Sequence, residues 1–350
     1  MRRPDPTRRT RPVAADVARA AGVSMATVSN FLNRPQLVAP NTGSRIDEAM
    51  RQLGYVPHGA ARQLAAGRSR LISLVVLDLA NPFFLEVARG VEDVASRNGY
   101  VVTLFNSDDS PTREQHALQA IEELRVSGLL ISPVGAHSTM IGRVRADGLP
   151  TVLLDRGGSK SEGCSVAVDD HSGGVVAGEH LIAAGLRRFA FVGGSTHLQQ
   201  HRARLRGLKA AMRGAGIADS DLIIVREQMS VAGGLRAGEE LLARSRGPIG
   251  VFCGNDLLAM GVERAVLTAG RRVPDDFAIV GYDDLTLAST TAVPLTSIAQ
   301  PMYDLGSTAA RLLIDEIQSA GHQHERVQFK PQLIARDSTP ATDRPGAERH

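Results

Sequence analysis

The chain has 350 residues, of which 43% are hydrophobic and only 4% aromatic, with no Trp. This length exceeds one typical domain, so we expect two or three compact units with aliphatic cores. No apolar run approaches the roughly 20 residues that span a bilayer, which argues against a membrane protein. The N-terminal stretch MRRPDPTRRTRP is not followed by the apolar segment of a secretory signal, which favours a cytoplasmic location.

Cysteine usage bears on metals and cofactors. Cys164 and Cys253 are the only cysteines, and they lie far apart without the Cys/His spacing of a metal site. This suits a reducing cytosol, and we expect neither a metal nor another cofactor.

The net charge of +3 conceals an asymmetry between the two ends of the chain. Residues 1–70 contain 12 Arg and 4 acidic residues, a net charge of +8, whereas the remainder carries −5. A basic head on an acidic body indicates a polyanionic partner for the head alone. The extreme N-terminus is more simply interpreted as a solvated basic arm.

Residues 13–33 have the pattern of two short helices joined by a turn at Gly22, with Ser24 as a plausible cap of the second helix. A third helix is predicted over Thr42–Leu53. The apolar residues at helical spacing are Val17, Ala18, Ala21, Val28, Phe31, Leu32, Ile46, Ala49, Met50 and Leu53. An ordinary three-helix bundle without a ligand is the alternative. The adjacent positive charge favours a DNA-reading helix–turn–helix, whose second helix enters the major groove.

From residue 71 onward, short apolar runs alternate with amphipathic helices, which predicts parallel sheets with a ligand crevice at the carboxyl ends of the strands. The predicted strands are Ile72–Leu77, Tyr100–Asn106, Gly128–Ser132, Thr151–Leu154, Arg188–Gly193, Ile249–Cys253 and Phe277–Gly281. The predicted helices are Pro82–Asn98, Arg113–Arg125, Ser172–Ala184, Arg204–Ala215, Asn255–Ala269 and Leu305–Ser319. The fold class is therefore an all-α head followed by a two-lobed α/β domain with two parallel, doubly wound sheets.

Short motifs in both parts of the chain form a recognisable set. In the head they are Asp16-Val17-Ala18, Ala21-Gly22-Val23-Ser24, Ala26-Thr27-Val28-Ser29, Leu32-Asn33 and Leu53-Gly54-Tyr55. In the body they include Asn81-Pro82-Phe83-Phe84, Arg204-Leu205-Arg206-Gly207, Asn255-Asp256, Gly281-Tyr282-Asp283-Asp284 and Gln300-Pro301. With these motifs the chain resembles, over about residues 12–339, the LacI/GalR family of transcriptional regulators, and its body resembles periplasmic sugar-binding proteins in fold.

The resemblance implies which residues contact DNA. They are Ser24, Met25, Ala26, Thr27, Ser29, Asn30 and Asn33 in the recognition helix and its cap, with Ala61 and Leu64 in a hinge helix. Met25 and Ala26 occupy the family's main base-discriminating positions. Leu64 occupies the position of a minor-groove wedge, which exchanges base unstacking for a bent site. Without the resemblance, Leu64 is a packing residue in a linker.

The head departs from the family pattern at three places. Asn30 stands where Arg is usual and could pair with adenine instead. Thr42-Gly43 replaces Thr-Arg, which removes a positive charge and weakens the start of the third helix. Val13 occupies the position of a capping Thr. These departures bear on the operator sequence and not on the class of protein.

The resemblance also implies an effector cleft. Its residues are Phe84, Ser132 and Asp155 from the first lobe, Arg204, Asn255 and Asp283 from the second, and Gln300 at the crossover. Alternatively, Arg204 forms a surface ion pair and Asp283 only caps the following helix. Leu198 and Met229 fall where purine-binding relatives keep aromatic and basic ligands, which argues mildly against a purine.

The expected domains are a DNA-binding domain over 11–59, a hinge over 60–70, an effector-binding and dimerisation domain over 71–339 and a disordered tail over 340–350. Within the third, lobe 1 covers about 71–168 and 300–325, and lobe 2 covers 169–296 and 326–339. Catalysis is not expected, since no P-loop, GxGxxG or GxSxG pattern is present. The His197/His201 pair is interpreted as a solvated helix face.

We therefore expect a homodimeric regulator, most simply a repressor, that reads a pseudo-palindromic operator in double-stranded DNA. A small molecule, in the first instance a sugar acting as inducer, controls its operator affinity. The alternatives are a ligand-binding protein of periplasmic type without a regulatory role, and a regulator that responds to a purine or another metabolite.

Overall fold

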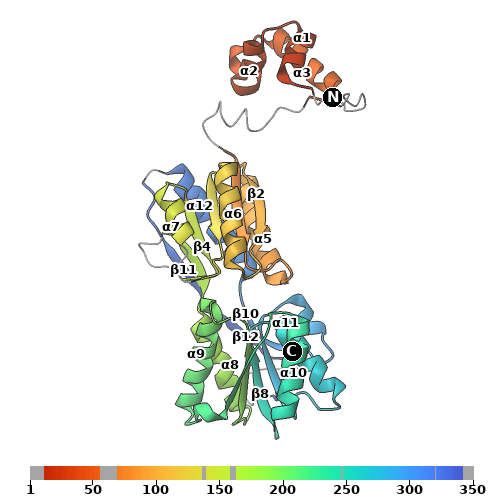
Figure 1. Cartoon of the computed structure of the whole chain (residues 1–350), viewed down its shortest axis with the longest axis vertical. Helices are drawn as coiled ribbons and strands as arrows, with labels where there is room; N and C mark the ends of the chain where they lie inside the picture. Colours follow the sequence, from red (N-terminus) through yellow and green to blue (C-terminus); the bar gives the residue numbers. More distant parts are fainter. Residues whose placement is uncertain are drawn as a thin grey trace, which may run out of the picture. The chain divides into compact units, whose positions relative to one another are not determined.

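The computed structural model describes residues 12–55, 69–135, 139–157, 163–245, 247–319 and 321–341. The chain forms two compact units, residues 1–70 and residues 71–350, and Figure 1 shows the elements of each. The predicted hinge contacts Ala61 and Leu64 lie outside the described residues, as does the side chain of Asn33. No helix in the described ranges is both long and apolar enough to cross a membrane.

The head contains the predicted helices, α1 (Ala14–Ala21), α2 (Met25–Asn33) and α3 (Pro40–Leu53), with the short 3-10 helix η1 (Pro35–Leu37) before α3. Gly22 ends α1 in the left-handed region at φ 62°. The Ser24 hydroxyl accepts from the Thr27 amide at 3.1 Å and so caps α2. The core is formed by Val17, Ala18, Ala21, Val28, Ile46, Ala49 and Tyr55.

Local structure compensates for two departures from the family pattern. The Val13 side chain makes no cap, but the Asp16 carboxylate accepts from the Val13 amide at 3.0 Å. Helix α3 starts earlier than predicted, with Pro40 as its first residue, a position that needs no N–H donor. A Cβ at Gly43 would lie 3.1 Å from the Phe31 ring, so glycine allows this ring to pack closely. The helical spacing of apolar residues predicts that Leu53 is buried with Ile46 and Ala49, but Leu53 is 38% exposed at the end of α3, so this prediction was wrong.

The second unit contains two six-stranded sheets among its described residues, one in each lobe (Figure 1). The first sheet has the order β11-β5-β4-β3-β1-β2, and all its pairings are parallel. The second has the order β12-β10-β9-β8-β6-β7, in which only β12 runs antiparallel to its neighbour. The strands of the first sheet are β1 (Leu71–Val76), β2 (Val101–Asn106), β3 (Gly128–Ile131), β4 (Thr151–Leu154), β5 (Ser165–Val168) and β11 (Arg326–Phe329). Those of the second are β6 (Phe189–Gly193), β7 (Leu222–Arg226), β8 (Ile249–Cys253), β9 (Phe277–Asp283), β10 (Thr296–Ala299) and β12 (Gln332–Ile334).

Helices cover the sheets, and closely packed pairs form between α5 and α12, α8 and α9, and α10 and α11. Their bounds are α5 (Pro82–Arg97), α6 (Pro111–Leu124), α7 (Thr139–Ala146), α8 (Asp170–Ala183), α9 (Gln199–Gly214), α10 (Val231–Arg244), α11 (Asp256–Thr268) and α12 (Met302–Gln318), with 3-10 helices η3 (Asp219–Asp221) and η4 (Thr286–Thr290). At Gly174 on α8, a Cβ would lie 2.0 Å from the Arg204 carbonyl oxygen. Only glycine therefore allows α9 to approach α8 this closely.

All seven predicted strands are present, whereas β5, β7, β10, β11, β12, α7 and α10 were not predicted. Near its end, the chain also crosses between the two lobes at a different point from the one predicted. Residues 326–339 were assigned to lobe 2, but β11 pairs with β5 in the first sheet and only β12 joins the second. The residues of β11 alternate between exposed and half-buried, so this short edge strand lacks the continuous apolar run that marks a central parallel strand.

Candidate functional site

Helix α2 has one buried face and one exposed face, as a recognition helix requires. Val28 is 1% exposed and packs in the core, whereas Met25 is 51% exposed. Ala26, Ser29 and Asn30 are also exposed, and Thr27 is half-buried. The Ser24 and Thr27 hydroxyls lie 2.8 Å apart at the start of the helix. This end of α2 therefore presents small and polar side chains next to the helix N-terminus, a suitable surface for DNA phosphates and base edges.

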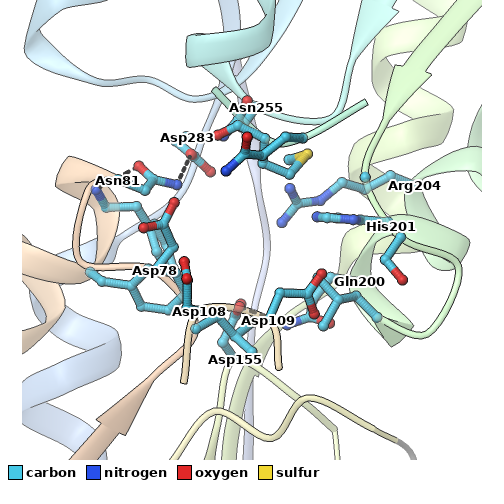
Figure 2. A pocket seen from close by; sticks show the side chains of 18 of the residues that line it. Asp78, Asn81, Asp108, Asp109, Asp155, Gln200, His201, Arg204, Asn255 and Asp283 are labelled. Atoms are coloured by element: carbon cyan, nitrogen blue, oxygen red, sulfur yellow. Dashed lines mark hydrogen bonds between the residues drawn. The ribbon is translucent and has the colours of Figure 1, made fainter. Parts of the chain in front are cut away.

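Within the second unit, a cavity of about 310 Å³ lies at the carboxyl ends of strands from both sheets (Figure 2). Six of the seven predicted effector residues line it: Phe84, Asp155, Arg204, Asn255, Asp283 and Gln300. The unpredicted lining residues include Asp78, Asn81, Asp108, Asp109, Gln200, His201, Glu227 and Gln228, and Leu198 and Met229 supply apolar surface. The three aspartates Asp78, Asp108 and Asp109 follow β1 and β2, so the strand-end rule could have found them.

Ser132 is the exception, and the prediction that it lines the cleft was wrong. Its amide donates to the Val75 carbonyl at 2.9 Å, which extends the pairing of β3 with β1 by one residue. The side chain is fully buried as part of the sheet.

Asp283, at the end of β9, joins elements of both lobes. It accepts from Gln300 Nε2 at 2.7 Å and, at the cavity wall, from Asn81 Nδ2 of the first lobe at 3.3 Å (Figure 2). Burial raises the pKa of its carboxyl to about 6, opposed by Arg204 and these two hydrogen bonds. Asp283 does not cap the following 3-10 helix, whose N-cap is Leu285. The alternative of a purely capping role was therefore wrong.

Asp155, after β4, forms a second link between the lobes. Its Oδ2 atom accepts from Gln200 Nε2 on α9 at 2.8 Å. Burial raises the pKa of the Asp155 carboxyl to about 7, and the nearby Asp170 carboxylate adds to this effect. Asn255, after β8, has its Oδ1 atom committed to capping α11 through the Leu258 amide at 2.9 Å. Its Nδ2 atom donates to the Met229 carbonyl at 3.5 Å, and both residues line the cavity.

Arg204 on α9 is 4% exposed, so the alternative of a surface ion pair was wrong. Its Nε donates to Asp170 at 2.7 Å, its Nη1 donates to the Gly254 carbonyl at 2.6 Å, and its guanidinium stacks 3.6 Å from the Tyr282 ring centre. Burial opposes its charge, but Asp170 and the other acidic neighbours hold its pKa above the ordinary value. These contacts fix a cation at the wall of the cavity.

His201 is buried and lines the cavity, so its interpretation as part of a solvated helix face was wrong. Helix α9 begins at Gln199, which leaves His197 outside it. Burial, followed by the charges of Arg204 and Arg226, lowers the pKa of His201 to about 3, so its imidazole is neutral at pH 7. No local sequence pattern marks Gln200 or His201 as a cavity residue. Both lie in the first turn of α9, and the position of this helix relative to the sheets places them at the cavity.

Three buried polar atoms around the cavity have no hydrogen-bond partner: Asp155 Oδ1, His201 Nδ1 and Gln300 Oε1. Such orphaned atoms cost free energy unless a bound molecule or water satisfies them. Two are oxygen acceptors, and the cavity wall carries further carboxylates. The cavity between the two lobes is therefore suited to a ligand with several hydroxyl donors. The same chain carries the helix–turn–helix head described above.

Comparison with known proteins agrees with a helix–turn–helix head joined to a two-lobed ligand-binding unit. Residues 14–58 match the model of the bacterial regulatory proteins of the lacI family, and residues 178–339 match the periplasmic binding protein-like domain. The ribose operon repressor of Escherichia coli is 36% identical over 326 residues, which cover 92% of this chain and 98% of that protein. The lac repressor dimer bound to operator and the anti-inducer ONPF superposes with a TM-score of 0.80 at 27% identity, over 95% of this chain and 100% of that one. A ribose-bound LacI family regulator from Enterococcus faecium has a TM-score of 0.71 at 32% identity, over 77% of this chain and 98% of that one.

The chain belongs to the LacI family of bacterial regulatory proteins. It is a DNA-binding transcriptional regulator with a separate ligand-binding unit, and its relatives are repressors and not enzymes.

Proposed function

We propose that this protein is a cytoplasmic, homodimeric repressor that an uncharged monosaccharide releases from a pseudo-palindromic operator. The observation that carries the proposal is the group of orphaned buried atoms, Asp155 Oδ1, His201 Nδ1 and Gln300 Oε1, at the interlobe cavity. Sugar hydroxyls both donate and accept, so one small ring can satisfy several such atoms together. A wrong ligand leaves them unpaired, which is how a polar site discriminates.

The charge of the cavity favours a neutral ligand. Six carboxylates line it (Asp78, Asp108, Asp109, Asp155, Glu227 and Asp283), against the single committed guanidinium of Arg204. The phosphate groups of phosphorylated sugars and nucleotides would be repelled by the excess negative charge of the cavity wall. The volume of about 310 Å³ is at the small end for ligand pockets, which favours a monosaccharide over an oligosaccharide.

Phe84 and the apolar pair Leu198 and Met229 can pack against the C–H faces of a sugar ring. Ribose is the first ligand to test, because one relative is a ribose operon repressor and another was solved with ribose.

The lobes also provide a route for allosteric control. The hydrogen bonds Asn81–Asp283 and Gln200–Asp155 join the two lobes at the cavity wall. A ligand that replaces or reinforces these bonds binds the open and closed arrangements with different affinities, which is the condition for shifting operator binding.

The test is a thermal-shift screen of the full-length chain against pentoses, hexoses, their phosphates and purine bases, followed by calorimetric titration. Binding to the native state raises its melting temperature by mass action. We expect a neutral sugar to bind and then to weaken binding to an operator selected from random DNA. A response only to a purine base or a phosphate ester would refute the sugar proposal. Absence of any sequence-specific DNA binding would leave a periplasmic-type binding protein as the function.

A further inference from the structure

A second constellation of chemically active side chains lies in the first lobe, away from the effector cavity. It combines Cys164, just before β5, with Glu316 on α12 and with His322 and His324 between α12 and β11. The donor atoms of all four side chains lie within 4.8 Å of one another. We propose that these four residues form a structural zinc site that ties the end of α12 and the start of β11 to β5.

The distances are close to those of a tetrahedral site. Zinc bonds of about 2.3 Å to sulfur and about 2.0–2.2 Å to nitrogen and oxygen place neighbouring ligand atoms roughly 3.3–3.8 Å apart. The Cys164 sulfur lies 3.1 Å from His322 Nε2 and 3.8 Å from His324 Nδ1. All four donor atoms lie within 4.8 Å of one another, at most about 1 Å beyond the tetrahedral edge, and side-chain rotation can close such a gap on metal binding.

The surroundings orient the ligands as around known zinc sites. His322 Nδ1 lies 2.6 Å from Asp315 Oδ2, and this contact leaves Nε2 directed at the Cys164 sulfur. A carboxylate on the outer nitrogen of a metal-binding histidine fixes its tautomer and ring orientation. The Glu325 amide donates to the Cys164 sulfur at 3.3 Å, which fixes the position of this sulfur atom beside the two histidines.

Hydrogen bonding within the cluster does not account for Glu316. Its Oε2 atom is buried without a hydrogen-bond partner, so this oxygen lacks the contact that a metal ion provides. A cavity of about 200 Å³ borders Glu316 and His324, and His324 is exposed, which gives an ion a path to the site.

The donor set and the charge balance favour zinc over other common cations. A thiolate with two imidazoles and a carboxylate is a borderline-soft set that Mg²⁺ and Ca²⁺ do not prefer. Thiolate and carboxylate together neutralise a divalent ion, and the Arg145 guanidinium lies near the Glu316 carboxylate. Four protein ligands leave no open position, so the site is structural and not catalytic.

Sequence spacing could not predict this site, since 152 to 160 residues separate Cys164 from its partners. The pairing of β5 with β11 and the packing of α12 on β5 bring them together. The expectation of no metal site, drawn from cysteine spacing, is revised accordingly. The cluster lies at the amino edge of the first sheet, because Cys164 and Glu325 directly precede their strands. The effector cavity occupies the opposite, carboxyl edge.

The test uses the untagged full-length protein, stripped with a chelator and titrated with zinc in competition with a chromophoric chelator. We expect one zinc ion per chain and a higher melting temperature in its presence. Substitution by Cys164→Ala or His324→Ala should weaken zinc binding by about 100-fold or more, and Asp315→Asn by about 10–100-fold. The matched controls Cys253→Ala and His116→Ala, a buried cysteine and an exposed histidine elsewhere, should bind zinc as the parent does.

The absorption spectrum of the protein loaded with cobalt in place of zinc provides a second test of the ligands. Cobalt-loaded protein should show thiolate-to-cobalt charge-transfer absorption, which disappears in Cys164→Ala and persists in Cys253→Ala. His324 is exposed, so His324→Ala remains informative if the Cys164 variant does not fold. Failure of the parent to bind zinc stoichiometrically, undiminished binding by His324→Ala, or a cobalt complex without thiolate absorption would each overturn the proposal.

Discussion

Gln200 and Asp155 join the two lobes through a hydrogen bond of 2.8 Å between Nε2 and Oδ2, at the wall of the effector cavity. The Asp155 carboxyl has a partner on one oxygen only, and its other oxygen is buried and unsatisfied. Such an arrangement costs stability in the ligand-free protein. Natural binding sites commonly hold polar groups in this way because the ligand satisfies them.

The cost of the buried Asp155 carboxyl should depend on pH. Its pKa rises from 3.8 to about 7 in the folded state, mainly through burial and then through Asp170. Between these values the folded chain holds more protons than the unfolded chain, so the free energy of unfolding falls as pH rises from about 4 to about 7. Asp155→Asn removes this dependence. Relative to the parent, its free energy of unfolding should rise between pH 5 and pH 8, by an amount on the order of a few kcal/mol. A difference that stays constant across this range, as expected for the exposed control Asp275→Asn, would contradict the prediction.

Removal of the Asp283 carboxylate should abolish the effector response while sparing the head. Asp283→Ala leaves the amides of Asn81 and Gln300 without their acceptor inside the cavity. The loss of one buried charged acceptor, at about 1.5–3 kcal/mol, corresponds to a decrease in sugar affinity of roughly 10- to 100-fold. Calorimetry measures this decrease, and a gel shift on the selected operator should show DNA binding close to that of the parent. Unchanged sugar affinity would remove Asp283 from the site.

The close contact between α8 and α9 should control the position of Arg204. In Gly174→Ala the new Cβ meets the Arg204 carbonyl oxygen at 2.0 Å, so the helices must separate. We expect a loss of about 1–3 kcal/mol from overpacking, together with weaker sugar binding. Gly214→Ala is the matched control, since its Cβ has nothing within 4 Å and lies at the end of α9. Equal stability of the two variants in denaturant titration would show that the helices tolerate the added methyl group.

Asn30 should contribute to the choice of operator. It is exposed on α2, on the face opposite the buried Val28, and Asn pairs well with adenine. Asn30→Arg should change the base selected at one symmetric pair of operator positions toward guanine, with a discrimination of about 1–3 kcal/mol. Selection from random DNA with each protein measures the change. The control Gln52→Arg adds the same charge to α3, and an identical shift with it would attribute the effect to charge alone.

Leu64 should bend the operator. If it acts as the minor-groove wedge that the family resemblance implies, Leu64→Ala reduces DNA bending and weakens operator binding, while sugar affinity stays the same. Circular-permutation gel shifts measure the bend. An undiminished bend angle would return Leu64 to the role of a packing residue in a linker.

Much of the fold could be predicted because it depends on local pattern. Helical spacing of apolar residues and a glycine turn defined the head, and short apolar runs located seven strands, although β5 and β10 inside the sheets were missed. Edge strands such as β11 and β12 were missed, since a strand paired on one side needs no continuous apolar run. The same strands complete the crossing between lobes, and this is why the predicted boundary near residue 326 differed from the structure.

The helix–turn–helix head and the parallel sheets were determined by the sequence itself, since periodicity, capping and turn chemistry act between near neighbours along the chain. The family resemblance extended this to six cavity residues, including Asp155, Arg204 and Asp283. Only the tertiary structure decided which groups face one another. Gln200 meets Asp155, and Cys164 meets His322, because separate helices and loops converge on them from distant parts of the chain. The same convergence buries these side chains. Burial raises the pKa of Asp155 and leaves its Oδ1 atom without a hydrogen-bond partner.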